Sequence, residues 1–65
     1  MEFKAGDKVM RIGASWNDCE KGQIYIVVRS FDSGSLKIQC LDGWQLNSTY
    51  DSKNFILFVQ WEEVV

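Results

Sequence analysis

The chain has 65 residues, of which 46% are hydrophobic and 14% aromatic, and its seven basic and nine acidic side chains give a formal net charge of −2. A chain of this length forms one domain, residues 1–65, with a thin core. Its hydrophobicity and small net charge exclude a disordered protein. Lysines and arginines are spread along the chain without a basic block, which argues against nucleic-acid binding through clustered phosphate contacts.

The first expected strand, residues 8–12, follows a turn at Gly6-Asp7, where glycine supplies a backbone conformation that is closed to other residues. A polar, turn-rich connection over residues 13–22 comes next, and it is longer than a hairpin needs. Long loops on a small rigid scaffold are where binding residues concentrate. Trp16 lies in the middle of this connection.

Residues 22–31 form the longest apolar run, rich in β-branched and aromatic residues and free of proline. This run predicts the long central strand of a small sheet, residues 23–31. Successive side chains on a strand point to opposite faces. Both faces are largely apolar here, so the strand is expected to be covered on both sides. One face holds Tyr25, Val27 and Phe31 with Arg29, and the other holds Ile24, Ile26 and Val28.

A short turn at residues 32–35 indicates that residues 36–41 are the hairpin partner of the central strand. Their alternation puts Cys40 on the face that this strand buries, as a small apolar side chain. Asp42-Gly43 is a hairpin signal. Residues 44–46 are then expected to form the fourth strand, with Trp44 and Leu46 on a common face, which places Trp44 in the core.

Residues 51–54 follow a segment rich in side chains that bond their own backbone, and they predict a single 3₁₀ turn. Residues 55–59 are expected to form the last strand, apolar on both faces. Residues 59–65 are a C-terminal tail that carries Trp61, Glu62 and Glu63.

No signal peptide, transmembrane segment or lipidation motif is visible in the sequence, so a cytoplasmic location without membrane contact is expected. The two cysteines, Cys19 and Cys40, are expected to be free thiols, because small disulfide scaffolds usually carry four or more. No metal or cofactor is expected. The chain has no histidine, and two isolated cysteines do not complete a zinc tetrahedron.

Five short strands, a long first loop, tight hairpins and a 3₁₀ turn before the last strand have the layout of a small SH3-like five-stranded barrel. Three short sequence motifs allow a more specific comparison: Phe3-x-x-Gly6-Asp7-Lys8-Val9-x-Arg11-Ile12, Gly22-x-x-Tyr25-x-Val27 and Tyr50-Asp51-x-x-x-Phe55-x-Leu57.

In this order the three motifs resemble small SH3-like proteins encoded by bacteriophages and prophages, over residues 3–58. The matching positions are turn glycines and core aromatics, which fit a backbone rather than a chemistry. The resemblance implies a protein that binds a host protein in the bacterial cytoplasm and redirects or blocks it, for instance a defence or nucleic-acid-processing enzyme. The proline-binding groove of signalling SH3 domains is not carried over, since its Ala-Leu-Tyr-Asp-Tyr stretch is missing.

Catalysis needs a nucleophile with a base, paired carboxylates or a metal, and the sequence offers none of these sets, so we expect a binding protein rather than an enzyme. Two alternatives stay open. One is a nucleic-acid-binding domain, which requires Lys8, Arg11, Arg29 and Lys37 to gather on one face. The other is a structural, self-associating subunit that uses exposed strand edges and the tail.

The candidate binding residues are tryptophans and acidic side chains of loops and tail. Trp16 is either a lid over the end of the barrel or an exposed anchor for a partner. The tail residue Trp61 either folds back on the barrel or binds a partner. The acidic loop residues form either a binding rim or ordinary surface. The protein-binding set is Trp16, Asp18, Glu20, Trp44, Trp61 and Glu62, and the acidic loop residues are Asp18, Glu20, Asp32 and Asp42.

Arg11 and Arg29 are both expected to point outward from strands and to pair with carboxylates across the sheet. Cys19 stands next to Asp18 and Glu20, whose negative charges should disfavour its thiolate and make it a poor nucleophile.

Overall fold

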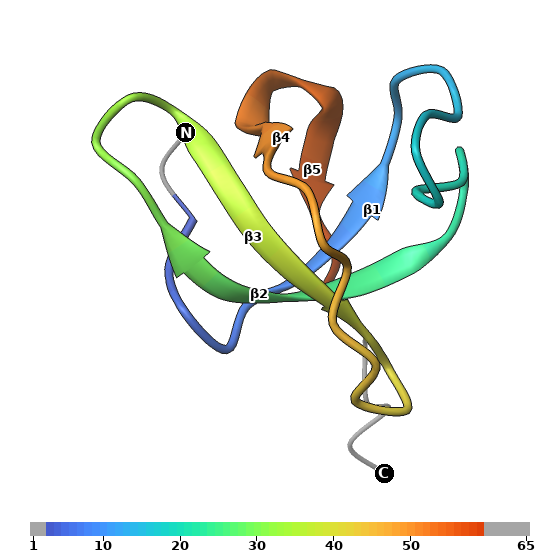
Figure 1. The fold of residues 1–65 in the computed structure, drawn as a ribbon, viewed down its shortest axis with the longest axis horizontal. Helices are drawn as coiled ribbons and strands as arrows, with labels where there is room; N and C mark the ends of the chain where they lie inside the picture. The colour runs from blue at the N-terminus through green and yellow to red at the C-terminus, as the bar shows by residue number, and fades with distance from the viewer. Residues whose placement is uncertain (1–2, 60–65) are drawn as a thin grey trace, which may run out of the picture.

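A computed structural model describes residues 3–59 of the chain. It contains five strands and one 3₁₀ helix, η1, which stands between the last two strands (Figure 1). Their bounds are β1 Lys8–Arg11, β2 Ile24–Ser30, β3 Ser35–Cys40, β4 Tyr50–Asp51, η1 Ser52–Asn54 and β5 Phe55–Leu57. Within the described residues there is no helix long and apolar enough to cross a membrane.

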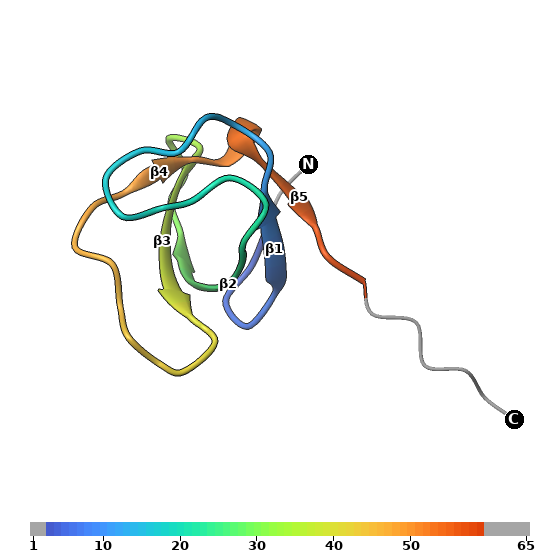
Figure 2. The same ribbon diagram turned by 90° about the vertical axis from the view of Figure 1, so that its right-hand side faces the viewer.

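The five strands form one antiparallel sheet in the order β4-β3-β2-β1-β5. The longest strand, β2, lies at its centre and bends strongly, so that the sheet curves around one core (Figure 2). Strands β4 and β5 are the two edges, and η1 joins them without pairing them. The prediction of an all-β protein with five strands is therefore confirmed, whereas the sheet is not closed into a barrel.

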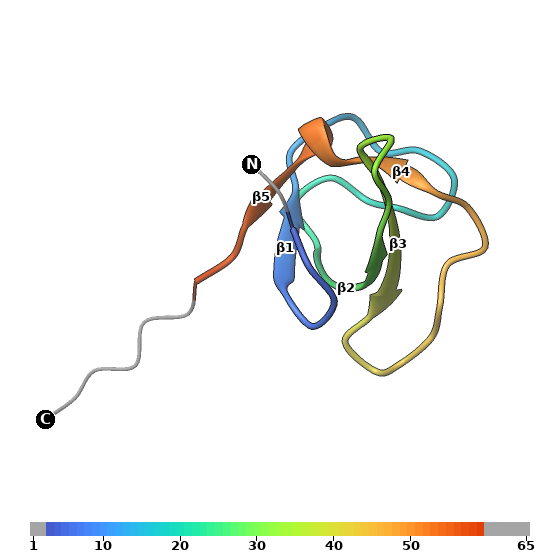
Figure 3. The ribbon, with the colours of Figure 1, turned by 90° about the vertical axis from the view of Figure 1, so that its left-hand side faces the viewer.

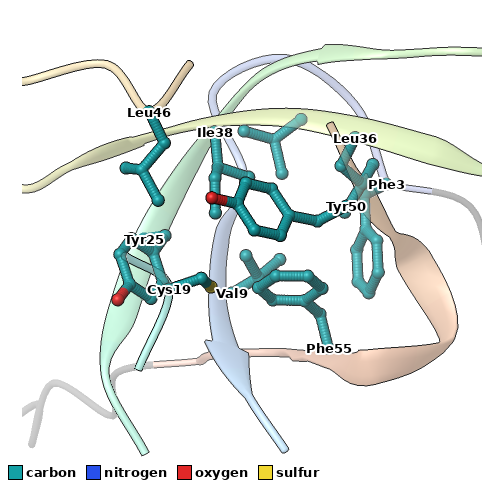
Figure 4. Packing of buried hydrophobic residues seen from close by; sticks show 10 residues of the cluster. Phe3, Val9, Cys19, Tyr25, Leu36, Ile38, Leu46, Tyr50 and Phe55 are labelled. Carbon is teal, nitrogen blue, oxygen red and sulfur yellow. The ribbon is translucent and has the colours of Figure 1, made fainter. Parts of the chain in front are cut away.

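Alternation along the strands explains which side chains enter the core. On β2, Tyr25 and Val27 are buried, while the side chains of the other face, such as Ile26, are half-buried. Strand β3 contributes its alternate positions in the same way. These side chains meet in one cluster together with residues from the loops (Figure 4). Its members are Phe3, Val9, Cys19, Tyr25, Val27, Leu36, Ile38, Leu46, Tyr50 and Phe55.

The predicted alternation fails at the end of β2. The register changes between the pairs Val27–Ile38 and Arg29–Lys37, which marks a β-bulge. Phe31 then lies in the turn after β2, where its N–H donates to Ser35 O at 2.9 Å, and it is half-buried rather than part of the core face.

The fourth strand is not where the sequence predicts it. Gly43, with φ 98°, donates to Cys40 O at 2.9 Å, and Cys40 N donates to Trp44 O at 2.7 Å, so the turn takes three residues instead of two. Residues 44–46 form only an isolated bridge between Gln45 and Gln39. Trp44 is 55% exposed and Leu46 1%, so the two side chains share no face.

The actual fourth strand is β4, which lies in the segment predicted to be turn-like. The 3₁₀ turn after it is confirmed, because the Asp51 side chain accepts from Lys53 N at 3.1 Å and caps η1. An exposed ion pair of 3.6 Å joins the side chains of the same two residues. Strand β5 begins at Phe55 as expected and ends at Leu57, two residues earlier than predicted.

Candidate protein-binding surface

The chain between β1 and β2, residues 12–23, carries three of the predicted binding residues and is called the first loop below. It crosses over from β1 to lie beside β4 (Figure 3). Its base is fixed by backbone bonds: Ile12 N donates to Asn54 O at 2.8 Å, and Gly22 N donates to Arg11 O at 2.8 Å. A Cβ on Gly13 would lie 2.6 Å from Asn54 Oδ1, so only glycine lets the two segments approach this closely.

The tip of the first loop is a two-residue hairpin. Trp16 and Cys19 exchange two backbone hydrogen bonds of 2.9 Å, and Asn17 and Asp18 between them have φ values of 50° and 70°. Positive φ at both central positions defines a type I′ turn, which Asn and Asp tolerate better than other non-glycine residues. This turn fixes the direction in which Trp16 leaves the loop.

Arg11 holds the inner side of the first loop. Its Nε and Nη2 atoms donate to Ala14 O at 3.2 and 2.8 Å, and its guanidinium lies 5.2 Å from the Phe55 ring centre and 5.9 Å from that of Tyr50. The residue is only 5% exposed. The prediction that Arg11 points outward to a carboxylate is therefore wrong. Arg11 lies opposite Phe55 across the β1–β5 pair, on the concave face of the sheet. There its positive charge contacts aromatic rings and Ala14 O instead of a carboxylate.

Two tyrosine hydroxyls attach the first loop to the core. Tyr50 donates to Asn17 O at 2.5 Å, and the hydroxyl of Tyr25 accepts from Glu20 N at 2.8 Å. The side chain of Asn17 donates to that of Ser48. Buried tyrosines place their rings in the core and their hydroxyls at its boundary, so each ring anchors a loop backbone.

Trp16 is presented on this fixed support. Its ring meets Tyr50 edge-on, with centroids 5.6 Å apart and planes at 82°, yet 57% of the residue remains exposed. The contact orients the indole and leaves most of it available to a partner. Asp18 and Glu20 are exposed on the same loop. The structure thus brings together three of the six predicted binding residues.

The other predicted binding residues lie elsewhere. Trp44 stands after the turn that follows β3, where Leu41 is also exposed, and the Asp42 side chain accepts from Trp44 N at 3.0 Å. The expected core position of Trp44 is therefore wrong, and the turn after β3 exposes two large apolar side chains, Leu41 and Trp44. Trp61 and Glu62 lie outside the described residues.

Arg29 also departs from its predicted pairing. It is exposed, its guanidinium lies 4.9 Å from the Phe31 ring centre, and its cross-strand partner is Lys37 rather than an acid. Of the four cations that a nucleic-acid surface would need, Arg11 is buried on the core face, whereas Lys8, Arg29 and Lys37 lie on the outer face. The complete set therefore does not gather on one face, because Arg11 lies on the opposite side of the sheet from the other three.

Cys19 belongs to the first loop and its side chain is buried in the core, and both cysteines are free thiols, as predicted. Burial raises the pKa of the Cys19 thiol above its ordinary value of 9.0, while the nearby Arg11 cation acts in the opposite direction. The thiolate is disfavoured as expected, but by loss of hydration rather than by Asp18 and Glu20. Cys40 is half-buried, and burial, followed by the charge of Asp42, raises its pKa.

These thiols predict a loss of stability in alkali. Above pH 9 the unfolded chain loses the Cys19 proton while the folded chain keeps it, so the free energy of unfolding falls as the pH rises. Tyr25 and Tyr50, whose pKa values burial raises above 10.0, steepen the fall at higher pH. Urea unfolding between pH 7 and 11 measures this. Cys19→Ala should show a shallower fall between pH 9 and 10. If the free energy of unfolding of the wild-type protein did not change up to pH 11, the account would be contradicted.

Asp18→Gly is expected to stabilise the protein, because Asp18 holds a left-handed conformation that costs a non-glycine residue free energy and glycine little. We expect a gain of about 0.5–1 kcal/mol in thermal or urea unfolding, with the greater entropy of glycine in the unfolded chain offsetting part of the relief. Glu20→Gly lies at a position without positive φ and serves as the control, which should lose stability. A loss with Asp18→Gly would show that the turn is not strained.

Sequence reasoning missed the residues that hold Trp16 in place. A Trp-Asn-Asp-Cys stretch does contain a signal for the hairpin tip, since Asn and Asp are the residues that accept positive φ. Nothing in the sequence alone points to Arg11, Tyr50 or Ser48 as partners of this loop. Within residues 3–59 no group of three or more Cys, Asp and Glu side chains lies close enough to hold a metal ion.

Comparison with protein-family models, with curated proteins and with solved structures finds no match for this chain.

Proposed function

We propose that the protein is a non-enzymatic protein-binding module with an SH3-like fold, which binds its partner through Trp16 on the first loop. The observation that carries the proposal is a tryptophan that is 57% exposed and yet held by a loop bonded to the core before, within and after its tip, at Ala14, Asn17 and Glu20. An exposed indole without such support would be an ordinary surface residue.

The SH3-like part of the proposal rests on the order of the elements. A long first loop, three consecutive antiparallel strands, a 3₁₀ turn and a last strand that returns to pair with β1 agree with that layout. The sequence motifs shared with bacteriophage SH3-like proteins favour a phage-encoded protein whose partner is a host protein in the bacterial cytoplasm. Binding would block or redirect that partner.

Physical arguments favour Trp16 as the anchor. Interface hot spots are rich in tryptophan, because one side chain buries a large area. The edge-on contact with Tyr50 and the type I′ turn already restrict the indole, so little side-chain entropy remains to be lost on binding. Asp18 and Glu20 on the same loop would favour a partner that offers basic side chains around an apolar pocket.

Nucleic-acid binding is the weaker candidate. Arg29 and Lys37 are cross-strand neighbours and supply local positive charge, but Arg11 is committed to Ala14 and two aromatic rings. The three cations left on the outer face, Lys8, Arg29 and Lys37, stand on three different strands and offer fewer phosphate contacts than such affinity needs.

The test is a pull-down from bacterial lysate with tagged protein, carried out with and without nuclease, followed by mass spectrometry of the retained proteins. The proposal predicts that one protein is retained in stoichiometric amount after nuclease treatment. Trp16→Ala should lower the retained amount at least about tenfold. Partners that disappear with nuclease would instead support nucleic-acid binding.

Trp44→Ala is the matched comparison, since Trp44 is equally exposed but lies on another turn. Retained binding with Trp44→Ala and loss with Trp16→Ala would locate the partner on the first loop. Loss with both would extend the surface to the turn after β3. Unchanged binding with Trp16→Ala would overturn the proposal.

A further inference from the structure

Strand β5 is an edge of the sheet without the usual protection. Natural edge strands carry charges, prolines or bulges that prevent pairing with another chain. The segment from Asn54 to Val59 has no charged residue and no proline, and its pairing with β1 is regular. Ile56 is 48% exposed, and Leu57 and Val59 are exposed as well. In Figure 2, β5 lies at one side of the molecule, with no other strand of residues 3–59 beyond it.

The backbone groups that face outward from β5 follow from its pairing with β1. Ile12 N donates to Asn54 O at 2.8 Å, and Phe58 N donates to Lys8 O at 2.9 Å. Antiparallel ladders use every second residue, so Asn54, Ile56 and Phe58 face β1. The backbone groups of Phe55, Leu57 and Val59 therefore face away from it.

One of these outward groups is already used, because Phe55 N donates to Ser52 O at the end of η1. Among residues 3–59, the remaining outward groups are the N–H of Leu57, the N–H of Val59, and the carbonyls of Phe55, Leu57 and Val59. These two donors and three acceptors alternate along the chain as in the open edge of a strand.

We propose that β5 pairs with β5 of a second copy of this chain, antiparallel and with the two-fold axis at Leu57. In this register the two Leu57 residues exchange N–H···O=C bonds with each other. Val59 N–H of each copy donates to Phe55 C=O of the other. Both open donors of each copy then meet open acceptors. The pairing leaves out the N–H of Phe55, which donates to Ser52 O, and the Val59 carbonyl that lies opposite it.

The side chains suit the same register. Ile56 of one copy lies opposite Phe58 of the other on the convex face of the sheet, and the two Leu57 side chains lie opposite each other on the concave face. Since the segment is uncharged, no like charges meet across the two-fold axis. A second copy is favoured over an unrelated strand because its open groups match these without any further requirement.

Sedimentation equilibrium of the full chain from micromolar to millimolar concentration tests the proposal. The predicted result is a concentration-dependent shift from the mass of one chain to that of two. Amide hydrogen exchange gives a residue-specific readout, since the N–H groups of Leu57 and Val59 should become protected only as the dimer forms. A single-chain mass at every concentration would overturn the proposal, even if those amides are protected.

Leu57→Pro is the sharpest variant. It removes an outward N–H and leaves the bonds between β1 and β5 in place, because proline is tolerated on an edge where its nitrogen faces solvent. Two bonds are lost per dimer, so the dimer should weaken by roughly 30-fold. Dimerisation of a folded Leu57→Pro protein with unchanged affinity would overturn the register.

Ile56→Lys is a second variant, which keeps the backbone and adds a charge to the edge. It should weaken the dimer at least about tenfold. Trp44→Lys, with the same charge change at a similarly exposed site, should leave the dimer unchanged. Equal weakening by both lysine variants would mean that net charge, not the edge of β5, controls association. Trp16→Ala should also leave the mass unchanged, which separates this proposal from the proposed function.

Discussion

Leu46→Ala is expected to lower the free energy of unfolding by about 3–4 kcal/mol, the range typical of a fully buried leucine whose site does not collapse. Leu46 lies in an irregular segment, yet it is 1% exposed and packs in the core cluster (Figure 4). A domain of 65 residues has only about 3–10 kcal/mol of total stability, so the variant should lose at least about a third of it. Circular dichroism with urea titration measures the loss.

Trp44→Ala is the control for this experiment. Trp44 is two residues away, is larger than leucine and is exposed, so its removal should change the free energy of unfolding by no more than about 0.5 kcal/mol. If instead Trp44→Ala lowered the free energy of unfolding more than Leu46→Ala, Trp44 would have to lie in the core, and the three-residue turn after β3 would be contradicted.

Arg11→Ala is expected to cost about 2–3 kcal/mol, from two part-buried hydrogen bonds to Ala14 O and the contacts of the guanidinium with two rings. The variant should also release the inner side of the first loop. Urea unfolding measures the stability, and faster amide exchange at Trp16 and Cys19 reports the release.

Arg29→Ala is the matched control, since Arg29 also lies over an aromatic ring but is exposed. It should cost less than about 1 kcal/mol and leave exchange in the first loop unchanged. Arg11→Lys keeps a charge but cannot reproduce the two parallel bonds to Ala14 O, so it should fall between wild type and Arg11→Ala. Equal costs for Arg11→Ala and Arg29→Ala would contradict the role assigned to Arg11.

Much of the sheet can be predicted from the sequence because hydrophobic alternation and turn chemistry act locally. Residues 24–30 and 36–40 are strands, and Asp51 caps the 3₁₀ turn, as the pattern indicates. The fourth strand could not be placed this way. Trp44 and Leu46 have the spacing of a common face, but the third turn residue, Gly43, changes how the chain leaves the hairpin.

The candidate site, too, can be predicted from the sequence only in part. Trp16, Asp18 and Glu20 are found by looking for a tryptophan in a long polar loop. The contacts that fix the loop are not found, because they join distant parts of the chain: Tyr50 reaches Asn17 across 33 residues. A buried arginine such as Arg11 carries no local signal either, since its partners are a carbonyl and rings that only the folded sheet brings near.

The central claim is that the first loop is a rigid support for an exposed Trp16. Backbone ¹⁵N relaxation of the whole protein tests it most directly. The account predicts order parameters of about 0.85 for residues 14–20, equal to those of the strands. Values below about 0.6 for Trp16 and its neighbours, as in a flexible loop, would contradict it.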